Sequence, residues 1–219
     1  MLITIFGKRG TGKTTLIRGN LDQMPGPVVV IDVLGNFKNY GYIESEKISE
    51  TVALVQDYKK TPRDSDGKLK EKIFVLQTQD PDQAVEYIGA ALWECGGGTL
   101  VLDEVDMIAY SKGSVLDQLV RYGRNRNVSI VTGCRRPAEL HRNFTAGANK
   151  IYVYQTQEPR DIEYFEKTIL GTKARKLGNL PEYHGILIDY DRKETCEFNV
   201  DENGFLYILN TEPFFQPTS

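Results

Sequence analysis

Residues 7–14 constrain the fold more than any other part of this sequence. They read Gly-Lys-Arg-Gly-Thr-Gly-Lys-Thr and match the pattern G-x-x-x-x-G-K-[ST]. The apolar run at residues 2–6 reads as a buried strand, and residues 15–18 continue as a helix. Glycines in such a turn let main-chain N–H groups converge on phosphate oxygens, and the helix N-terminus adds positive potential. The pattern therefore predicts a phosphate-binding loop.

The residue types in this loop indicate which ligand it takes. The ammonium group of Lys13 can reach the β- and γ-phosphates of a nucleotide, and the hydroxyl of Thr14 can hold Mg²⁺. We therefore expect ATP and Mg²⁺ as cofactors. The expected nucleotide-binding residues are Gly7, Lys8, Arg9, Gly10, Thr11, Gly12, Lys13, Thr14 and Thr15.

A second signature is an apolar run, residues 99–102, that ends in two acids. A strand here would place Asp103 beside the phosphate loop, where it can bind Mg²⁺ through water, and Glu104 could polarise an attacking water. An apolar run followed by an acid is common, but downstream of a phosphate loop it is specific. The acidic pair favours hydrolysis of ATP over phosphoryl transfer to another acceptor.

The remaining pattern predicts an α/β fold. Fully apolar runs of the kind buried in parallel sheets alternate with segments of helical character. From residue 183 the pattern changes to short runs separated by turns, which is typical of antiparallel strands. We expect one P-loop NTPase (RecA-like) domain over residues 1–210, with a mostly parallel central sheet flanked by helices and C-terminal antiparallel strands. Residues 211–219 are expected to form a tail. Residues 49–58 predict a short helix at best.

Composition narrows the class of protein. The chain has 219 residues, a net charge of −3 and no apolar run long enough for a membrane span. Its three cysteines are scattered without metal-like spacing, which favours a reduced intracellular compartment, and we expect a cytoplasmic protein.

Two segments are locally basic. Residues 119–143 contain six arginines and one acid, a local balance of +5. These arginines could bind nucleic-acid phosphates, stabilise transition-state charge on ATP, or form surface ion pairs. Residues 59–72 hold six Lys or Arg against three acids, and a solvated loop is the simpler interpretation there. Lys68, Lys70 and Lys72 are nevertheless candidates for contacts with DNA.

With these features in place, the chain resembles the HerA/FtsK superfamily of DNA-pumping ATPases. It is most similar to viral genome-packaging ATPases, with zonula-occludens-toxin-like phage ATPases as near relatives. The likeness covers most of residues 1–190 and lies in the phosphate loop, in residues 30–32, in residues 102–104, and in residues 121–125 together with 135–141.

The resemblance implies a motor that translocates double-stranded DNA and packages a viral genome. It implies a homohexameric ring, docking to a capsid or portal-vertex protein, and a location in the host cytoplasm or the virion. By the same likeness Lys13, Glu104, Arg124 and Arg135 are catalytic, and Thr14 and Asp103 hold the metal. Arg124 matches the arginine of the family's Gly-Arg-Asn/Lys run and would be an arginine finger, with Arg121 and Arg126 as the rival candidates. Arg135 stands where many members have a sensor glutamine, so it would sense the γ-phosphate as a charge.

Other functions fit parts of the pattern. A phosphotransferase would use the same loop, although Glu104 offers a kinase little. A GTP switch lacks its Asn-Lys-x-Asp signature here, and an ABC-type ATPase lacks Ser-Gly-Gly-Gln. A phage assembly ATPase that extrudes DNA would usually need a membrane-spanning segment.

Overall fold

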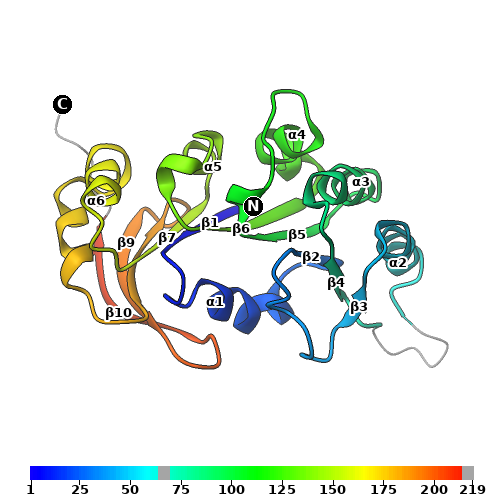
Figure 1. The fold of residues 1–219 in the computed structure, drawn as a ribbon, viewed down its shortest axis with the longest axis horizontal. Coiled ribbons are helices and arrows are strands. Elements are labelled where there is room, and N and C mark those ends of the chain that lie inside the picture. Colours follow the sequence, from blue (N-terminus) through cyan, green and yellow to red (C-terminus); the bar gives the residue numbers. More distant parts are fainter. Residues whose placement is uncertain (64–69, 214–219) are drawn as a thin grey trace. The chain divides into compact units, whose positions relative to one another are not determined.

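The computed structural model describes residues 1–63 and 70–213 (Figure 1). The chain forms two compact units. The first comprises Met1 and Leu21–Thr132, and the second comprises Leu2–Asn20 and Gly133–Ser219. Strand β6 (Val128–Cys134) begins in the first unit and ends in the second.

The strands of the first unit pair in parallel. Besides β6, these strands are β2 (Val28–Asp32), β3 (Ile43–Ser45), β4 (Ile73–Gln77) and β5 (Gly98–Asp103). Their order in the sheet is β6-β5-β2-β4-β3. β2 pairs in parallel with both β4 and β5, and Val30 lies opposite Val75 and Val101. All of β2 and β5 is buried, as expected for apolar, β-branched runs between parallel neighbours.

Three helices of the first unit lie on the same face of its strands (Figure 1). They are α2 (Ile48–Lys60), α3 (Pro81–Glu94) and α4 (Val115–Tyr122). α3 begins as its sequence predicts, because the Asp80 side chain accepts a hydrogen bond from the Gln83 N–H and Pro81 occupies the first turn. α2 has 13 residues and is longer than the short helix we expected. Short 3-10 turns are η1 (Leu21–Gln23), η2 (Val105–Met107) and η3 (Gly123–Arg126).

The second unit combines parallel and antiparallel strands in the order β6-β1-β7-β8-β9-β10. They include β1 (Leu2–Phe6), β7 (Lys150–Tyr154), β8 (His184–Asp189), β9 (Glu194–Val200) and β10 (Leu206–Pro213). β1 pairs with β7 in parallel, and β8, β9 and β10 follow in antiparallel pairs. The predicted change from parallel to antiparallel pairing after residue 183 is confirmed.

Helices cover both faces of the strands in the second unit. α1 (Lys13–Asn20) lies on one face, and α5 (Asn143–Ala146) and α6 (Pro159–Phe165) lie on the other (Figure 1). The 3-10 turn η4 (Pro137–Glu139) precedes α5, and α6 continues through η5 (Glu166–Leu170) and η6 (Gly171–Asn179). The α/β fold class predicted from the sequence is confirmed.

Two details differ from the expected boundaries. β3 lies in a stretch that the sequence does not mark as a strand, and β10 continues to Pro213, beyond the expected end of the domain at residue 210. Residues 214–219 of the expected tail lie outside the described residues. Cys95, Cys134 and Cys196 form no disulfide bond with one another. Over residues 1–63 and 70–213, no helix has the length and apolar character needed to cross a membrane.

Candidate functional site

The phosphate loop lies in the second unit, between β1 and α1. Gly10 and Gly12 have φ values of 83° and 99°, in the left-handed region that glycine adopts most easily. The N–H of Gly7 donates to the carbonyl oxygen of Cys134 over 3.1 Å, which ties the start of the loop to the end of β6. A side chain at Gly7 would collide with Oγ1 of Thr11, so only glycine fits there. The backbone thus has the glycines where a phosphate cradle needs them.

Lys13 is the first residue of α1, and its side chain folds back into the loop. Its Nζ donates to the carbonyl oxygens of Gly7 over 2.7 Å and Lys8 over 3.4 Å, and the residue is only 5% exposed. A buried ammonium group is tolerated when it is hydrogen-bonded. Lys13 forms no ion pair with any described residue, so no carboxylate neutralises the positive charge that it places in the loop. Thr14 and Thr15 follow in the first turn of α1, both half-buried. An ammonium, a hydroxyl and a helix N-terminus together suit a Mg²⁺-bound polyphosphate.

Two tyrosines of the second unit contact Gly12. The hydroxyl of Tyr154, the last residue of β7, donates to the carbonyl oxygen of Gly12 over 3.2 Å. Burial raises the pKa of Tyr154 far above its ordinary value, so the phenol keeps its proton and remains a donor. A Cβ built on Gly12 would lie 3.2 Å from Cδ1 of Tyr183. Neither tyrosine is marked by a local motif in the sequence. β7 pairs in parallel with β1, so both strands end at the same edge, and this pairing brings Tyr154 to the loop.

The strand-end acids lie in the first unit. Asp103 ends β5, is 4% exposed, and accepts a hydrogen bond from Nδ2 of Asn36 over 3.4 Å. Glu104 follows with φ 78° and ψ 54°, a left-handed conformation that is uncommon for a residue with a side chain. It is 7% exposed, and its carbonyl oxygen accepts the N–H of Met107 over 3.0 Å. The turn after β5 therefore holds two buried carboxylates in succession.

Asp32, at the end of β2, organises the loop that carries Asn36. Its two carboxylate oxygens accept the main-chain N–H groups of Asn36 and Phe37, each over 2.9 Å. The same loop brings the Asn36 side chain to Asp103. Asp32 thus supports Asp103 through Asn36, a link that the sequence alone did not indicate.

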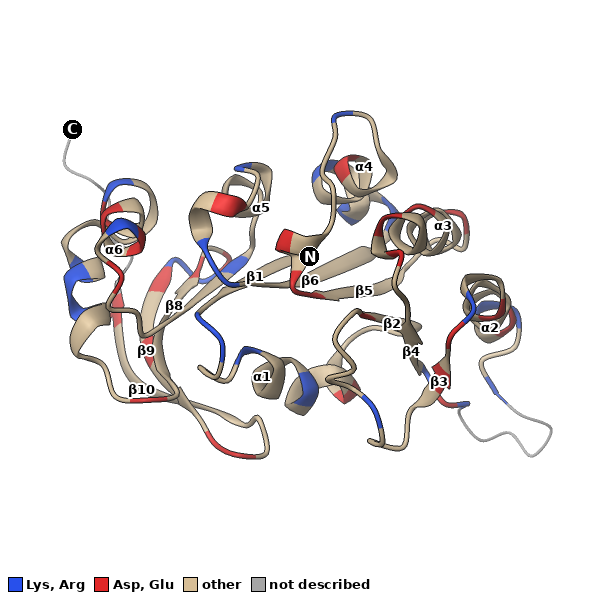
Figure 2. Ribbon diagram, viewed as in Figure 1, with Lys and Arg blue, Asp and Glu red and all other residues tan. Residues whose placement is uncertain are grey.

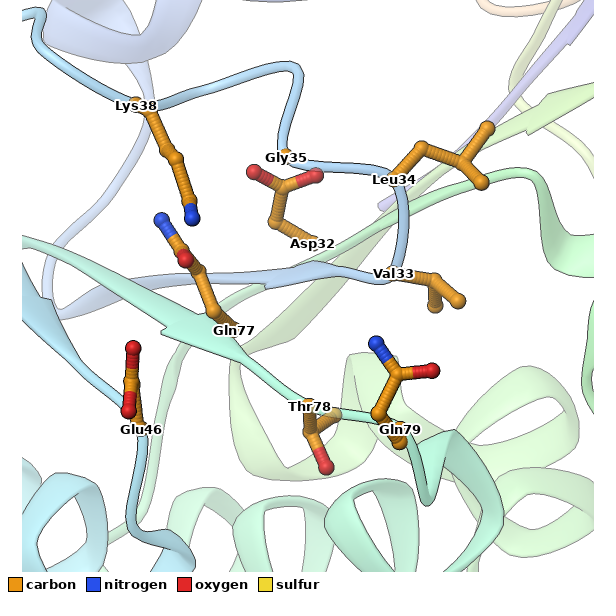
Figure 3. Close-up of a pocket in the computed structure, with 9 residues that line it drawn as sticks. All are labelled: Asp32, Val33, Leu34, Gly35, Lys38, Glu46, Gln77, Thr78 and Gln79. Atoms are coloured by element: carbon orange, nitrogen blue, oxygen red, sulfur yellow. The ribbon is translucent and has the colours of Figure 1, made fainter.

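A polar cavity of about 460 Å³ lies at the carboxyl ends of β2 and β4 in the first unit. In Figure 3 the Lys38 side chain points toward Gln77, and the Asp32 carboxylate lies beside them. The lining residues are Asp32, Val33, Leu34, Gly35, Lys38, Glu46, Gln77, Thr78 and Gln79. This edge of a parallel sheet is where ligands commonly bind. The predicted catalytic and metal-binding residues are not among those that line it.

The three candidate finger arginines of the first unit differ in their contacts. Arg121 lies 3.9 Å from Asp117 and 5.9 Å from the ring centre of Tyr122, and the Arg126 guanidinium lies 5.4 Å from the ring centre of Trp93. Arg124, in η3, is exposed and forms no ion pair with any described residue. Arg124 is therefore the one of these three whose guanidinium is uncommitted in the described chain.

Arg135 follows β6 in the second unit. The carbonyl oxygen of the preceding residue, Cys134, accepts the Gly7 N–H, so Arg135 leaves the strand next to the start of the phosphate loop. Its side chain is exposed. The neighbouring Arg136 lies close enough to Asp161 to influence its ionisation. Burial raises the pKa of the Asp161 carboxyl group, and the positive charge of Arg136 opposes this rise.

Two of the three lysines considered for DNA are engaged within the fold. Nζ of Lys70 lies 2.7 Å from the Asp57 carboxylate, whose pKa it lowers, and Nζ of Lys72 donates to the carbonyl oxygen of Met24 over 2.9 Å. Lys68 lies outside the described residues. Lys and Arg occur on α1, α2, α4 and α6, so positive charge is not confined to one element (Figure 2).

Comparison with known proteins identifies the fold. No family model matches the chain, and no curated protein matches it. Among solved structures, the genome packaging NTPase B204 from Sulfolobus turreted icosahedral virus 2, in complex with AMPPCP, is 16% identical with a TM-score of 0.69 over 98% of each chain.

Two further solved structures are similar. B204 described as the DNA-packaging ATPase from Sulfolobus turreted icosahedral virus is 16% identical with a TM-score of 0.60 over 97% of each chain. The bacterial conjugative coupling protein TrwBΔN70 is 11% identical with a TM-score of 0.51, over 85% of this chain and 81% of that one. The chain therefore has the fold of these P-loop ATPases along nearly its whole length, which confirms the fold implied by the sequence resemblance.

Proposed function

We propose that the protein hydrolyses ATP with Mg²⁺. The observation that carries this proposal is Glu104: a buried carboxylate held in a left-handed turn directly after the buried Asp103, in a chain that also has a complete phosphate loop. A kinase gains little from a second carboxylate here, whereas a hydrolase needs one to polarise water.

In the proposed reaction each residue has one task. Lys13 and the N–H groups of the loop bind the β- and γ-phosphates, while Glu104 accepts a hydrogen bond from the attacking water and then its proton. The water oxygen bonds to the γ-phosphorus as the bond to the β–γ bridging oxygen breaks, which gives ADP and phosphate. The Thr14 hydroxyl and Asp103 would hold Mg²⁺, which neutralises charge on the phosphate oxygens.

We further propose that hydrolysis drives translocation of double-stranded DNA by a homohexameric ring, as in packaging of a viral genome. This is supported by fold similarity to structures named as genome-packaging NTPases and by the arginines of residues 119–143. Such a ring would dock on a capsid or portal-vertex protein and work in the host cytoplasm or the virion.

The ATPase rate, measured with and without double-stranded DNA alongside the native mass, tests this proposal. We expect DNA of arbitrary sequence to raise the rate, and a discrete ring mass. Because phosphate contacts release counterions, the DNA affinity should fall steeply between low and high salt. An ATPase indifferent to DNA at every salt concentration would contradict the motor function and leave ATP hydrolysis standing.

Arg124 is proposed to act as the arginine finger on the ATP of the neighbouring subunit. It is exposed in a 3-10 turn and pairs with none of the described carboxylates, whereas Arg126 lies over Trp93. A guanidinium beside the γ-phosphoryl group is worth roughly 10³–10⁵ in rate in characterised hydrolases, and Arg135 is proposed to sense the same group.

A mixing experiment tests action between subunits. Arg124→Ala should abolish turnover, and Arg126→Ala serves as the matched control that keeps it. Mixed rings of Arg124→Ala and Lys13→Ala subunits should regain activity at interfaces that pair the intact residues. Near-normal turnover by Arg124→Ala alone, or no recovery in rings shown to be mixed, would rule out this role.

A further inference from the structure

The ring of Tyr183 lies against the phosphate loop while remaining open to solvent. Its Cδ1 is 3.2 Å from where a side chain on Gly12 would begin, and the residue is 48% exposed. Both residues belong to the second unit. An aromatic ring next to the residue that precedes Lys13 flanks the place where phosphates are expected to bind.

The backbone around Tyr183 is fixed although its ring is exposed. Its φ is 61°, a left-handed conformation that a bulky residue rarely adopts. Its carbonyl oxygen accepts the N–H of Val200 over 3.2 Å, and the next residue, His184, donates its N–H to Pro181 over 3.3 Å and accepts that of Gln155 over 3.0 Å. Strained residues persist where surrounding contacts determine them, and they cluster at ligand sites. These bonds fix the main chain from which the ring projects.

The two tyrosines at Gly12 have different surroundings. Tyr154 is completely buried and uses its hydroxyl on the Gly12 carbonyl oxygen, so it supports the loop from inside. Tyr183 contacts the same glycine with its ring and keeps nearly half of its surface in solvent. Support of the loop explains Tyr154, but it does not explain why an aromatic side chain is held outward at Tyr183.

We propose that Tyr183 is the stacking platform for the purine base of the bound nucleotide. The inference rests on the proposed function, since it assumes that the loop binds the triphosphate. A base tethered through ribose to phosphates in the loop must lie on the surface beside it, where the Tyr183 ring is exposed. Stacking on an aromatic ring favours any base with a π-face. The platform therefore contributes affinity for the nucleoside and little choice between adenine and guanine.

The test compares a ligand that has a base with one that lacks it. Calorimetry on the full chain would measure binding of AMPPCP and of inorganic tripolyphosphate. Because of the lost base stacking, Tyr183→Ala should weaken the binding of AMPPCP about tenfold or more and leave the affinity for tripolyphosphate unchanged. Tyr183→Phe should bind like the wild type. Tyr183→Asn loses the ring but tolerates a left-handed backbone, so it gives the same readout if the alanine variant folds poorly.

Each outcome has a distinct meaning. Unchanged AMPPCP affinity in both ringless variants overturns the platform and leaves the proposed function intact. An equal loss for AMPPCP and tripolyphosphate shows that Tyr183 only shapes the loop, which also overturns it. If the wild-type protein binds neither ligand, the proposed function itself fails, and this result is recognised before any variant is made.

Discussion

The phosphate loop and the turn after β5 both use left-handed backbone, but with different residues. In the loop these positions are Gly10 and Gly12, with φ values of 83° and 99°. After β5 the position is Glu104, with φ 78°. For a residue with a Cβ this conformation costs roughly 1–2 kcal/mol, a penalty that glycine avoids.

The difference follows from what each region presents. In the proposed function the loop binds phosphates through main-chain N–H groups, so a side chain at Gly7 or Gly12 would only obstruct it. In the proposed function the turn after β5 acts through a carboxylate, which glycine cannot supply. Strain at Glu104 therefore marks a position where the side chain is needed, and the comparison separates residues that bind through the backbone from those that act through a functional group.

Glu104→Gln should give the largest effect and the clearest contrast. The amide fills the same space but accepts no proton, so turnover should fall by about 10²–10⁴ while nucleotide affinity stays unchanged. Steady-state ATPase rates and calorimetry with AMPPCP measure the two quantities, with exposed Glu94→Gln as the control. Full turnover in Glu104→Gln would mean that another group activates the water.

Lys13→Ala should show the reverse pattern, in which binding is lost. Removing a charged donor should weaken AMPPCP by about 10- to 100-fold, and turnover falls because the site is empty. Exposed Lys47→Ala is the matched control for loss of one positive charge. Tight binding by Lys13→Ala would show that main-chain groups suffice, which would sharpen the contrast with Glu104.

Gly12→Ala and Gly10→Ala test whether the loop needs glycine for backbone conformation or for space. Both have positive φ, but a Cβ at Gly12 would meet Tyr183 at 3.2 Å and one at Gly10 would meet nothing within 4 Å. Gly12→Ala should weaken AMPPCP binding about tenfold, and more than Gly10→Ala does. Equal losses would mean that conformation alone decides.

The smallest expected effect is a difference in stability between the variants Glu104→Gly and Glu104→Ala. Alanine is normally better than glycine within regular elements, by roughly 0.5–1 kcal/mol. At a left-handed position the order should reverse, so the free energy of unfolding should be about 1 kcal/mol larger for Glu104→Gly than for Glu104→Ala. Urea titration of both variants measures this, and the usual order would show that the turn relaxes when the carboxylate is removed.

Local sequence patterns could predict those parts of the candidate site whose residues are adjacent in the chain. The sequence placed the phosphate loop and Asp103-Glu104 at strand ends because strand, turn and functional group are consecutive there, and their chemical roles stay predictions. Asn36 and Tyr183 could not be predicted in this way, since their contacts depend on where a loop and a distant strand return. The length of α2 was underestimated because its sparse apolar positions give weak periodicity, whereas burial of Thr51 and Val55 fixes the helix.

Because Asp103 is linked to Asp32 through Asn36, substitutions in this loop should fall into two groups: those that affect Asp103 and those that do not. Because Asp32 holds the loop by main-chain N–H groups, the side chains of residues 33–35 take no part in those hydrogen bonds. Exposed Leu34 can therefore be exchanged with little effect on Asp103, while a change at Asn36 alters the environment of its carboxylate directly. For the Mg²⁺ site proposed at Asp103, varying Asn36 would therefore change the surroundings of one expected ligand while both nucleotide motifs stay intact.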